Sequence, residues 1–320
     1  MGDRRRTGAR LLRRRNRAEV VGLCVCVALV GCACSSATSP TGTKGGAIVA
    51  VGAENEYANV IGQIGGKYVK VTAILSNPNT DPHTFEASPS VAGVVSAAQL
   101  IVQNGIGYDT FMNTIESASP NPKRKVVVVQ KLLGLADSTP NPHLWYDPKT
   151  MPAVAKAIAG DLSALVPAHA AYFRENLAKF DRSLTPWLRA ISLFKASHPR
   201  TPVATTEPVA DYMLQAAGTE NETPWALQAD IMNGVDPAPE DITLQDNLFT
   251  QHKVKVFLYN EQVTDSLTQS FLALARSNGI PTVGVYETMP TPGYDYQTWM
   301  MAEVQALEKA VADKVSTEHL

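Results

Sequence analysis

Four side chains suited to binding a transition metal lie in loops next to predicted strands. His83 lies in the polar segment "NTDPHTFEAS" (79–88), and His143 lies in "NPHLWYDP" (141–148). Glu207 and Glu287 follow the apolar runs at 202–206 and 281–286. Ligands of open α/β sheets bind at the carboxyl ends of the strands, so we expect the four side chains to face one cleft. Two neutral imidazoles and two carboxylates balance the charge of a first-row divalent cation.

The ligand types narrow the choice of metal. All four cysteines lie at positions 24, 26, 32 and 34, so the rest of the chain has no thiolate to select a soft metal. An oxygen cage for Ca²⁺ or Mg²⁺ would not include two histidines. Carboxylates favour Mn²⁺, whereas intrinsic affinity favours Zn²⁺ over Mn²⁺. The residues therefore leave Mn²⁺, Zn²⁺ and Fe²⁺ open.

Each of these residues also has an ordinary structural interpretation. A loop histidine beside a proline is usually a solvent-facing turn residue, and a glutamate after a strand often serves as a negative charge at a helix N-terminus. The joint placement of all four favours the metal interpretation.

The surrounding pattern predicts an α/β fold with two lobes. Short apolar runs alternate with helical stretches in each half, which is typical of parallel sheets flanked by helices. The predicted strands cover 47–51, 68–75, 99–103, 125–129, 201–206, 253–259 and 280–286. The predicted helices cover 54–65, 88–98, 107–117, 208–217, 263–277 and 295–315, and a further helix begins near Lys149.

A long helix is predicted between the two lobes. Apolar residues recur at alternating spacings of four and three from Phe173 to Phe194, which is one stripe on a helix. Pro186 interrupts the hydrogen-bond ladder, and because the stripe stays in phase across it we expect a kink. We interpret residues 168–198 as a rigid helix that joins an N-terminal lobe (47–167) to a C-terminal lobe (199–320).

The N-terminus resembles an export signal. Eight arginines precede a short apolar run that ends in "LVGC", and this pattern predicts a lipoprotein signal peptide over 1–31 with lipidation of Cys32. Cys34 is the weaker alternative. Residues 32–46 are rich in Ser, Thr, Gly and Pro, so we expect a flexible tether on the outer face of the bacterial cell membrane.

Charge argues against nucleic-acid binding. Without residues 1–31 the chain has 20 Lys and Arg against 28 Asp and Glu, a net charge of −8. Nucleic-acid affinity comes mainly from Lys and Arg on phosphate, so we expect no such partner.

Several segments resemble the metal-binding substrate-binding lipoproteins of ABC importers, the zinc/manganese class (ZnuA/TroA-like, cluster A-I). "DPHTFEASP" (81–89) and "NPHLWYDP" (141–148) resemble its two histidine loops. "GGKYVKVTAIL", "AAQLIVQNGIGYD" and "DPAPEDI" resemble further family segments. The resemblance implies two α/β lobes joined by a long helix, with a metal held between them by four side chains.

The resemblance also implies a ligand set. It places the ligands at His83, His143, Glu207 and Glu287, where the family has Glu at the third position in manganese-type members and Asp at the fourth. Because Glu287 departs from that Asp, Asp295 in the next loop is an alternative. Asp81, Glu86 and Asp147 are candidates for orienting the histidines. The stretch before His143 lacks the His-rich loop of many zinc-type members, which favours manganese.

These residues are compatible with three functions. The favoured one is a monomeric, non-enzymatic protein that captures Mn²⁺ or Zn²⁺ and delivers it to a membrane permease and its ATPase. Four protein ligands would leave no open position for a substrate or an activated water. An envelope metallohydrolase would need such a position and a general base. A siderophore-type binding protein would instead line its cleft with arginine and aromatic side chains.

Overall fold

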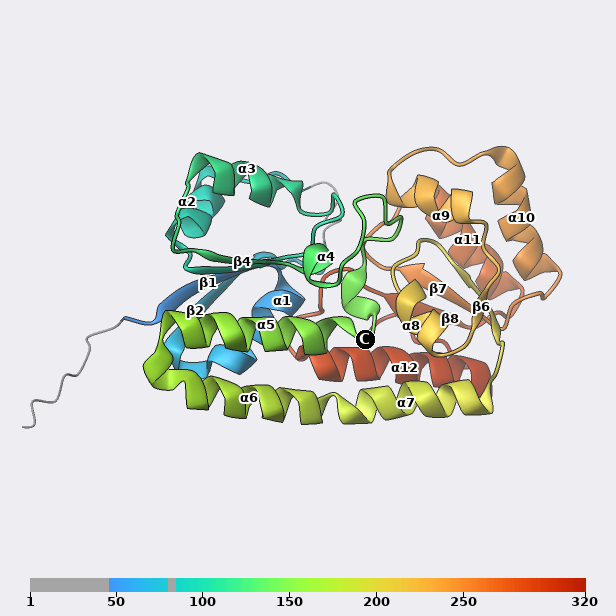
Figure 1. Ribbon diagram of the computed structural model, residues 1–320. Helices are drawn as coiled ribbons and strands as arrows, with labels where there is room; N and C mark the ends of the chain where they lie inside the picture. Colours follow the sequence, from blue (N-terminus) through green and yellow to red (C-terminus); the bar gives the residue numbers. More distant parts are fainter. Residues whose placement is uncertain (1–45, 80–84) are drawn as a thin grey trace, which may run out of the picture. The chain divides into compact units, whose positions relative to one another are not determined.

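Two four-stranded parallel sheets form the framework of this computed structural model, which describes residues 46–79 and 85–320. The first sheet has the order β2-β1-β3-β4 and the second has the order β6-β5-β7-β8 (Figure 1). The strands are β1 (Ile48–Glu54), β2 (Val69–Leu75), β3 (Leu100–Gln103), β4 (Lys125–Val128), β5 (Pro202–Thr205), β6 (Glu220–Asn221), β7 (Val256–Asn260) and β8 (Thr282–Val285). All the pairings between these strands are parallel, as the alternating pattern predicted.

Helices cover both faces of each sheet. Those of the first half are α1 (Asn55–Gly65), α2 (Pro89–Ala97), α3 (Thr110–Ala118), α4 (Val129–Leu132) and α5 (Thr150–Leu165). Those that follow are α6 (Ala170–Ser183), α7 (Thr185–Ser197), α8 (Asp211–Ala216), α9 (Trp225–Met232), α10 (Pro239–Thr250), α11 (Ser266–Ser277) and α12 (Tyr296–Asp313). The described residues also include the short 3₁₀ helices η1 (Gly66–Tyr68), η3 (Leu144–Tyr146) and η4 (Pro167–His169). The structure confirms the predicted fold class of two parallel-sheet lobes joined by a long helical segment.

The joining segment is two helices rather than one kinked helix. Figure 1 shows α6 and α7 running end to end beside α5 and α12. They meet at Leu184, and Pro186 falls in the first turn of α7, where its missing N–H costs little. The apolar stripe stays in phase across the junction: Phe173, Phe180, Leu184, Trp187, Ile191 and Phe194 are all buried.

One hydrophobic core runs through both lobes. It contains Tyr57 of α1, Trp145 of η3, Trp187 of α7 and Trp299 of α12, together with strand residues of both sheets. Smaller clusters fill the outer face of each sheet, beneath α2 and α3 in the first and beneath α9, α10 and α11 in the second. Residues Gly45–Leu320 form one compact unit, and the two lobes share its core.

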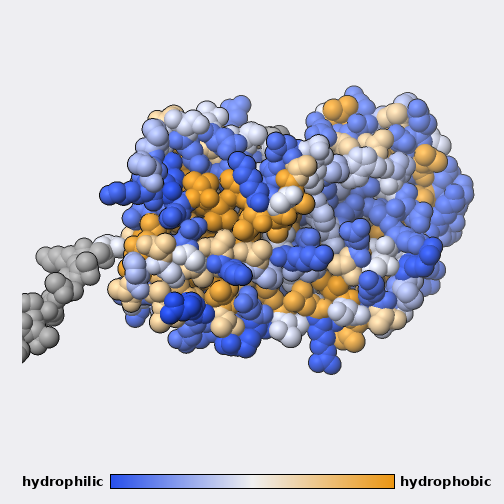
Figure 2. All heavy atoms as spheres, in the orientation of Figure 1, coloured by the Kyte–Doolittle hydropathy of each residue, from blue (hydrophilic) through white to orange (hydrophobic). Residues whose placement is uncertain are grey.

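Several elements depart from the sequence expectation. The helix predicted from 107 begins at Thr110, because Gly105, Ile106 and Gly107 all have positive φ (88°, 53° and 79°) and so cannot be helical. The short strand β6 and the helices α4, α9 and α10 were not predicted. Figure 2 shows apolar side chains gathered over β4 and α4, where Val126 and Leu132 are 39% and 41% exposed.

No helix among the described residues is long and apolar enough to cross a membrane. The predicted signal peptide, Cys32 and most of the tether lie outside the described residues. The proposed domain boundaries therefore stay a prediction.

Candidate metal centre

Three of the four predicted ligands meet between the two lobes. His143 precedes η3, Glu207 lies two residues after β5, and Glu287 lies two residues after β8. His143 Nε2 is 3.3 Å from Glu287 Oε2. All three side chains are buried, with exposed fractions of 0%, 1% and 1%. His83 and Asp81 lie outside the described residues, so their part in the site stays a prediction.

An amide joins the two carboxylates. Asn260, the last residue of β7, donates from Nδ2 to Glu207 Oε1 at 3.1 Å and to Glu287 Oε1 at 2.8 Å. The hydroxyl of Tyr108 donates to Glu287 Oε2 at 2.8 Å. Within the described residues, no three His, Cys, Asp or Glu side chains form a group that could hold a metal ion by themselves. A closed coordination shell therefore needs a further ligand from outside the described residues or a small shift of these side chains.

The imidazole of His143 is oriented by Asn141. Asn141 Oδ1 is 2.8 Å from His143 Nδ1 and also accepts the His143 backbone N–H at 3.0 Å. An oxygen at this position makes Nδ1 the protonated nitrogen, so Nε2 keeps its lone pair for a metal on the Glu287 side. An orienting partner of this kind fixes the tautomer of a metal-binding histidine.

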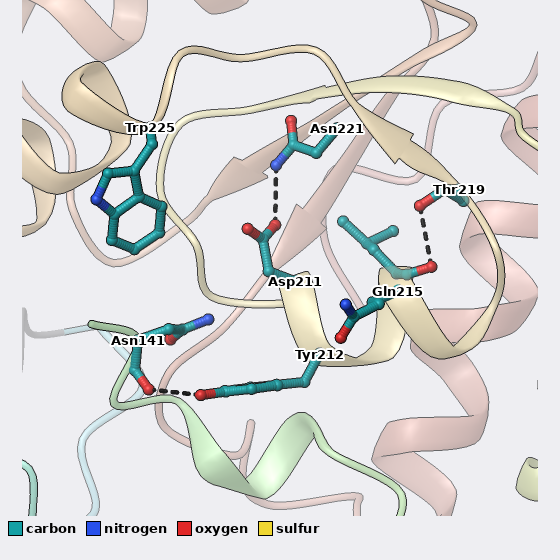
Figure 3. Close-up of a pocket in the computed structure, with 8 residues that line it drawn as sticks. Asn141, Asp211, Tyr212, Gln215, Thr219, Asn221 and Trp225 are labelled. Carbon is teal, nitrogen blue, oxygen red and sulfur yellow. Dashed lines mark hydrogen bonds between the residues drawn. The ribbon is translucent and has the colours of Figure 1, made fainter. Parts of the chain in front are cut away.

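Asn141 also connects this loop to the other lobe. Its Nδ2 donates to the carbonyl of Pro208, next to Glu207, at 2.7 Å. Its own carbonyl accepts the Tyr212 hydroxyl at 2.9 Å. Figure 3 shows Asn141 and Tyr212 at the edge of a surface pocket that also contains Asp211, Asn221 and Trp225. One asparagine thus orients His143 and holds its loop against the loop that carries Glu207.

The remaining candidates lie elsewhere. Asp295 caps α12, where it accepts the Thr298 backbone N–H at 2.9 Å in a capping box. Asp147 accepts the Lys149 backbone N–H at 3.0 Å just before α5, and Glu86 is exposed. The orienting residue that the structure brings to His143 is Asn141, which the sequence reasoning missed although it stands two residues before the histidine.

Buried acids lie near the centre on the first lobe. Glu54 ends β1 and Glu56 is the second residue of α1, and both are almost completely buried. Burial raises the pKa of both carboxyls well above the usual range, and the nearby Asp109 raises that of Glu54 further. Burial also raises the pKa of Asp109 to about 6, although its oxygens accept the backbone N–H groups of Asn104 and Gly105. The shifts of Glu54 and Glu56 favour their neutral forms, whereas Asp109, with a pKa of about 6, is mostly ionised at pH 7.

A comparison with protein families identifies the chain's relatives. The model of the family "Zinc-uptake complex component A periplasmic" (ZnuA) matches residues 51–310. The chain belongs to this family. The match spans both sheets and the loops that carry His143, Glu207 and Glu287, so the centre described above lies within the ZnuA-family part of the chain.

Individual relatives agree with this assignment. The chain is 25% identical over 163 residues to the manganese-binding lipoprotein MntA of Bacillus subtilis, which is 49% of this chain and about half (52%) of that relative. It is 23% identical over 255 residues to the manganese ABC transporter substrate-binding lipoprotein PsaA of Streptococcus pneumoniae, covering 74% of this chain and 80% of PsaA. The solved structure of the periplasmic zinc-binding protein TroA of Treponema pallidum superimposes with a TM-score of 0.70 at 18% identity, over 85% of this chain and all of that one. This last likeness shows that the ZnuA-family chain has the TroA fold.

Proposed function

We propose that this chain is the extracytoplasmic solute-binding lipoprotein of an ABC importer, and that it captures Mn²⁺ or Zn²⁺ between its lobes for delivery to a permease and its ATPase. The observation that carries the proposal is the meeting of His143, Glu207 and Glu287 in one buried place within a ZnuA-family chain. The names of its relatives, a manganese-binding lipoprotein and a manganese importer lipoprotein, support the same function.

The proposed ligands are His83, His143, Glu207 and Glu287. Two carboxylates and two imidazoles match the charge and ligand preference of Mn²⁺ or Zn²⁺, and Fe²⁺ has similar preferences. The 3.3 Å approach of His143 to Glu287 supports Glu287 over Asp295 as the fourth ligand, because Asp295 is engaged in capping α12. The enclosed position of the carboxylates supports a bare ion rather than an organic chelate.

The same geometry supports binding rather than catalysis. A catalytic metal site keeps one coordination position open for water or substrate. Four protein ligands that are 0–1% exposed, as the three described ones are, would close that position. We therefore propose a transport protein that is not an enzyme and that acts as a monomer.

Thermal unfolding of the metal-stripped chain from Gly45 onward tests the proposal. A cation that binds only the folded state stabilises it by about 2.7 kcal/mol at a hundredfold excess over Kd. We expect Mn²⁺ or Zn²⁺ to raise Tm, and His83→Ala, His143→Ala, Glu207→Ala and Glu287→Ala each to abolish most of the increase.

Matched variants serve as controls for this test. Asp295→Ala and His198→Ala should keep the full metal-induced shift, since Asp295 caps a helix and His198 contacts Glu308 at 3.1 Å. An absence of any shift with Mn²⁺, Zn²⁺ and Fe²⁺ would refute the proposal. Retained binding in Glu287→Ala together with loss in Asp295→Ala would reassign the fourth ligand.

The proposed anchor has a separate test. In cells that express the full chain, Cys32→Ser should release the protein from the membrane fraction, whereas Cys34→Ser should leave it there. The opposite result would move the lipidation site to Cys34.

A further inference from the structure

The hydroxyl of Tyr146 lies at a junction between the two lobes. Tyr146 ends η3, three residues after His143, and its backbone N–H donates to the His143 carbonyl at 3.2 Å. Its hydroxyl is 2.9 Å from the carbonyl of Tyr286 and 3.3 Å from the Tyr286 backbone nitrogen. Tyr286 immediately precedes Glu287. The Tyr146 side chain therefore links the loop that carries His143 to the segment that carries Glu287.

Glu303 of α12 completes this junction. Its Oε1 is 3.1 Å from the Tyr146 hydroxyl and accepts the Trp299 indole N–H at 3.0 Å. The Tyr146 ring also packs edge-on against Trp299, with ring centroids 5.5 Å apart. All three side chains are buried, and Glu303 is only 1% exposed. The Glu303 carboxyl is therefore separated from the proposed ligands by Tyr146 and is not itself one of them.

The number of protons at the junction constrains the state of Glu303. The Tyr146 hydroxyl has one proton but two neighbouring acceptors, the Tyr286 carbonyl and Glu303 Oε1. If Glu303 is ionised and Tyr146 donates to the Tyr286 carbonyl, Oε1 still accepts from Trp299, but no proton lies between the Tyr146 oxygen and Oε1 at 3.1 Å. If Glu303 is protonated on Oε1, it donates to the Tyr146 oxygen, Tyr146 donates to the Tyr286 carbonyl, and Oε1 still accepts from Trp299. Only the neutral acid places a proton in each of these contacts, whereas Glu303 Oε2 has no hydrogen-bond partner among the described residues in either state.

The electrostatic surroundings agree with this proton count. Burial raises the pKa of Glu303 to about 8, although the hydrogen bonds with Trp299 and Tyr146 oppose the increase. Among the described residues, the titratable groups acting at the junction are the phenols of Tyr146 and Tyr286, with Glu56 of α1 acting on Tyr146 and with Glu261 and Tyr294 acting on Tyr286. His198, which follows α7, pairs with Glu308 of α12 rather than with Glu303.

We infer that Glu303 is a positioning residue that acts as a neutral acid, and that through Tyr146 it fixes the spacing between His143 and Glu287 for metal binding. This inference rests on the proposed metal-binding function. A glutamine at position 303 keeps the contact that the inference depends on, since its Nε2 in place of Oε1 donates to Tyr146, although that nitrogen cannot accept the Trp299 indole N–H. A leucine removes both contacts and leaves the Tyr146 oxygen with one donor fewer.

The test compares Mn²⁺ and Zn²⁺ affinity among wild type, Glu303→Gln and Glu303→Leu by calorimetry at pH 7, on the chain from Gly45. Loss of a residue that orients a ligand costs roughly 10–100-fold in metal affinity. We expect the metal affinity of Glu303→Leu to be at least about tenfold weaker than that of wild type, and the affinity of Glu303→Gln to stay within about twofold of it. Glu308→Gln, one helical turn further along α12, is the matched control and should leave affinity unchanged.

A pH series separates positioning from a general loss of packing. If only the protonated form binds well, wild-type affinity falls about tenfold relative to Glu303→Gln from pH 7 to pH 9, because the competent fraction falls by that factor. Both proteins share the same metal hydrolysis, so their ratio isolates Glu303. A Glu303→Gln affinity as low as that of Glu303→Leu, unchanged affinity in Glu303→Leu, or a constant ratio across this range would each overturn the inference.

The unfolding of the metal-free proteins distinguishes this inference from the proposed function. A neutral Glu303 makes wild type lose stability relative to Glu303→Gln as pH rises from the ordinary carboxyl pKa of 4.5 to about 8. If wild type binds none of the cations, the proposed function and the metal-positioning role both fall, while this measurement still decides the protonation state. If the unfolding free energies of wild type and Glu303→Gln changed with pH in the same way, Glu303 would not be a neutral acid in the folded protein.

Discussion

Replacing Asn260 with leucine removes the amide that joins the two carboxylates of the proposed centre. Asn260 Nδ2 supplies one proton to Glu207 and one to Glu287, at 3.1 and 2.8 Å, and all three residues are buried. Hydrogen bonds to charged groups contribute about 1.5–3 kcal/mol each, so the metal-free variant should lose about 3–6 kcal/mol of unfolding free energy. Leucine has the same branching but larger terminal groups, so it leaves no cavity and any packing change adds to the loss.

Urea unfolding of the metal-stripped chain from Gly45 measures this loss. Asn247→Leu is the control, because the Asn247 side chain accepts an exposed hydrogen bond from Gln251 at 2.9 Å, and surface changes usually stay within about 0.5 kcal/mol. A loss below about 1 kcal/mol in Asn260→Leu would refute the reasoning, since the two bonds would then contribute less than one ordinary neutral hydrogen bond.

The same variant also probes the ligand assignment. If Glu207 and Glu287 bind the cation, the metal compensates the two carboxylates for the N–H donors that the variant lacks. We therefore expect saturating Mn²⁺ or Zn²⁺ to raise the Tm of Asn260→Leu by more than it raises that of wild type. An equal increment in the two proteins would indicate that the carboxylates do not bind the metal directly.

Three further changes have outcomes that follow from single contacts. Tyr108→Phe removes the donor to Glu287 Oε2 and should cost roughly 1.5–3 kcal/mol in urea unfolding of the metal-free protein; an unchanged midpoint would contradict it. Burial raises the pKa of Asp211 from 3.8 to about 6, so wild type loses stability as pH rises through that window. Asp211→Asn should therefore gain up to about 3 kcal/mol at pH 7, with no gain near pH 3. In Gly52→Ala the new Cβ would lie 2.3 Å from the Ala58 nitrogen, so we expect a fall in Tm of several degrees, and an unchanged Tm would show that α1 can move.

The sequence predicted the framework of the centre because parallel strands end at a common edge. Glu207 and Glu287 follow β5 and β8, neighbours of the central strand β7, so their convergence follows from topology once the strands are recognised. The long apolar stripe likewise predicted the joining helices, although it could not show that a helix would end at Leu184 and a new one begin.

The residues that hold the ligands were not predictable in the same way. Asn260 ends an apolar strand and reaches two residues that are 53 and 27 positions away. Glu303 lies within an amphipathic helix, where a lone glutamate normally marks the solvent face, yet it contacts Tyr146 across 157 positions. Neither contact has a local signal, because each depends on how the two lobes pack. Asn141 is the exception, since an amide two residues before a histidine is a local pattern.

The contacts between the lobes bear on how an ion could enter. Asn55 exchanges two hydrogen bonds with the backbone of Met289, at 2.8 and 2.9 Å, and the side chains of Gln63 and Gln297 pair reciprocally at 2.9 and 2.8 Å. These bonds join α1 of the first lobe to the loop before α12 and to α12 itself in the second lobe. Separating the lobes as rigid bodies would break these bonds and expose that core, at about 25 cal/mol for each Å² of apolar surface.

A local route avoids that cost. Tyr108 both lines a surface pocket of about 370 Å³, together with Asp137 and Asn233, and donates to Glu287. Moving this one phenol breaks its hydrogen bond to Glu287 and its edge-on ring contacts with His143 and Trp145. Because moving one side chain costs less than opening the shared core, we expect metal exchange to begin at Tyr108 and its glycine-flanked loop, while α6 and α7 keep the two lobes in place.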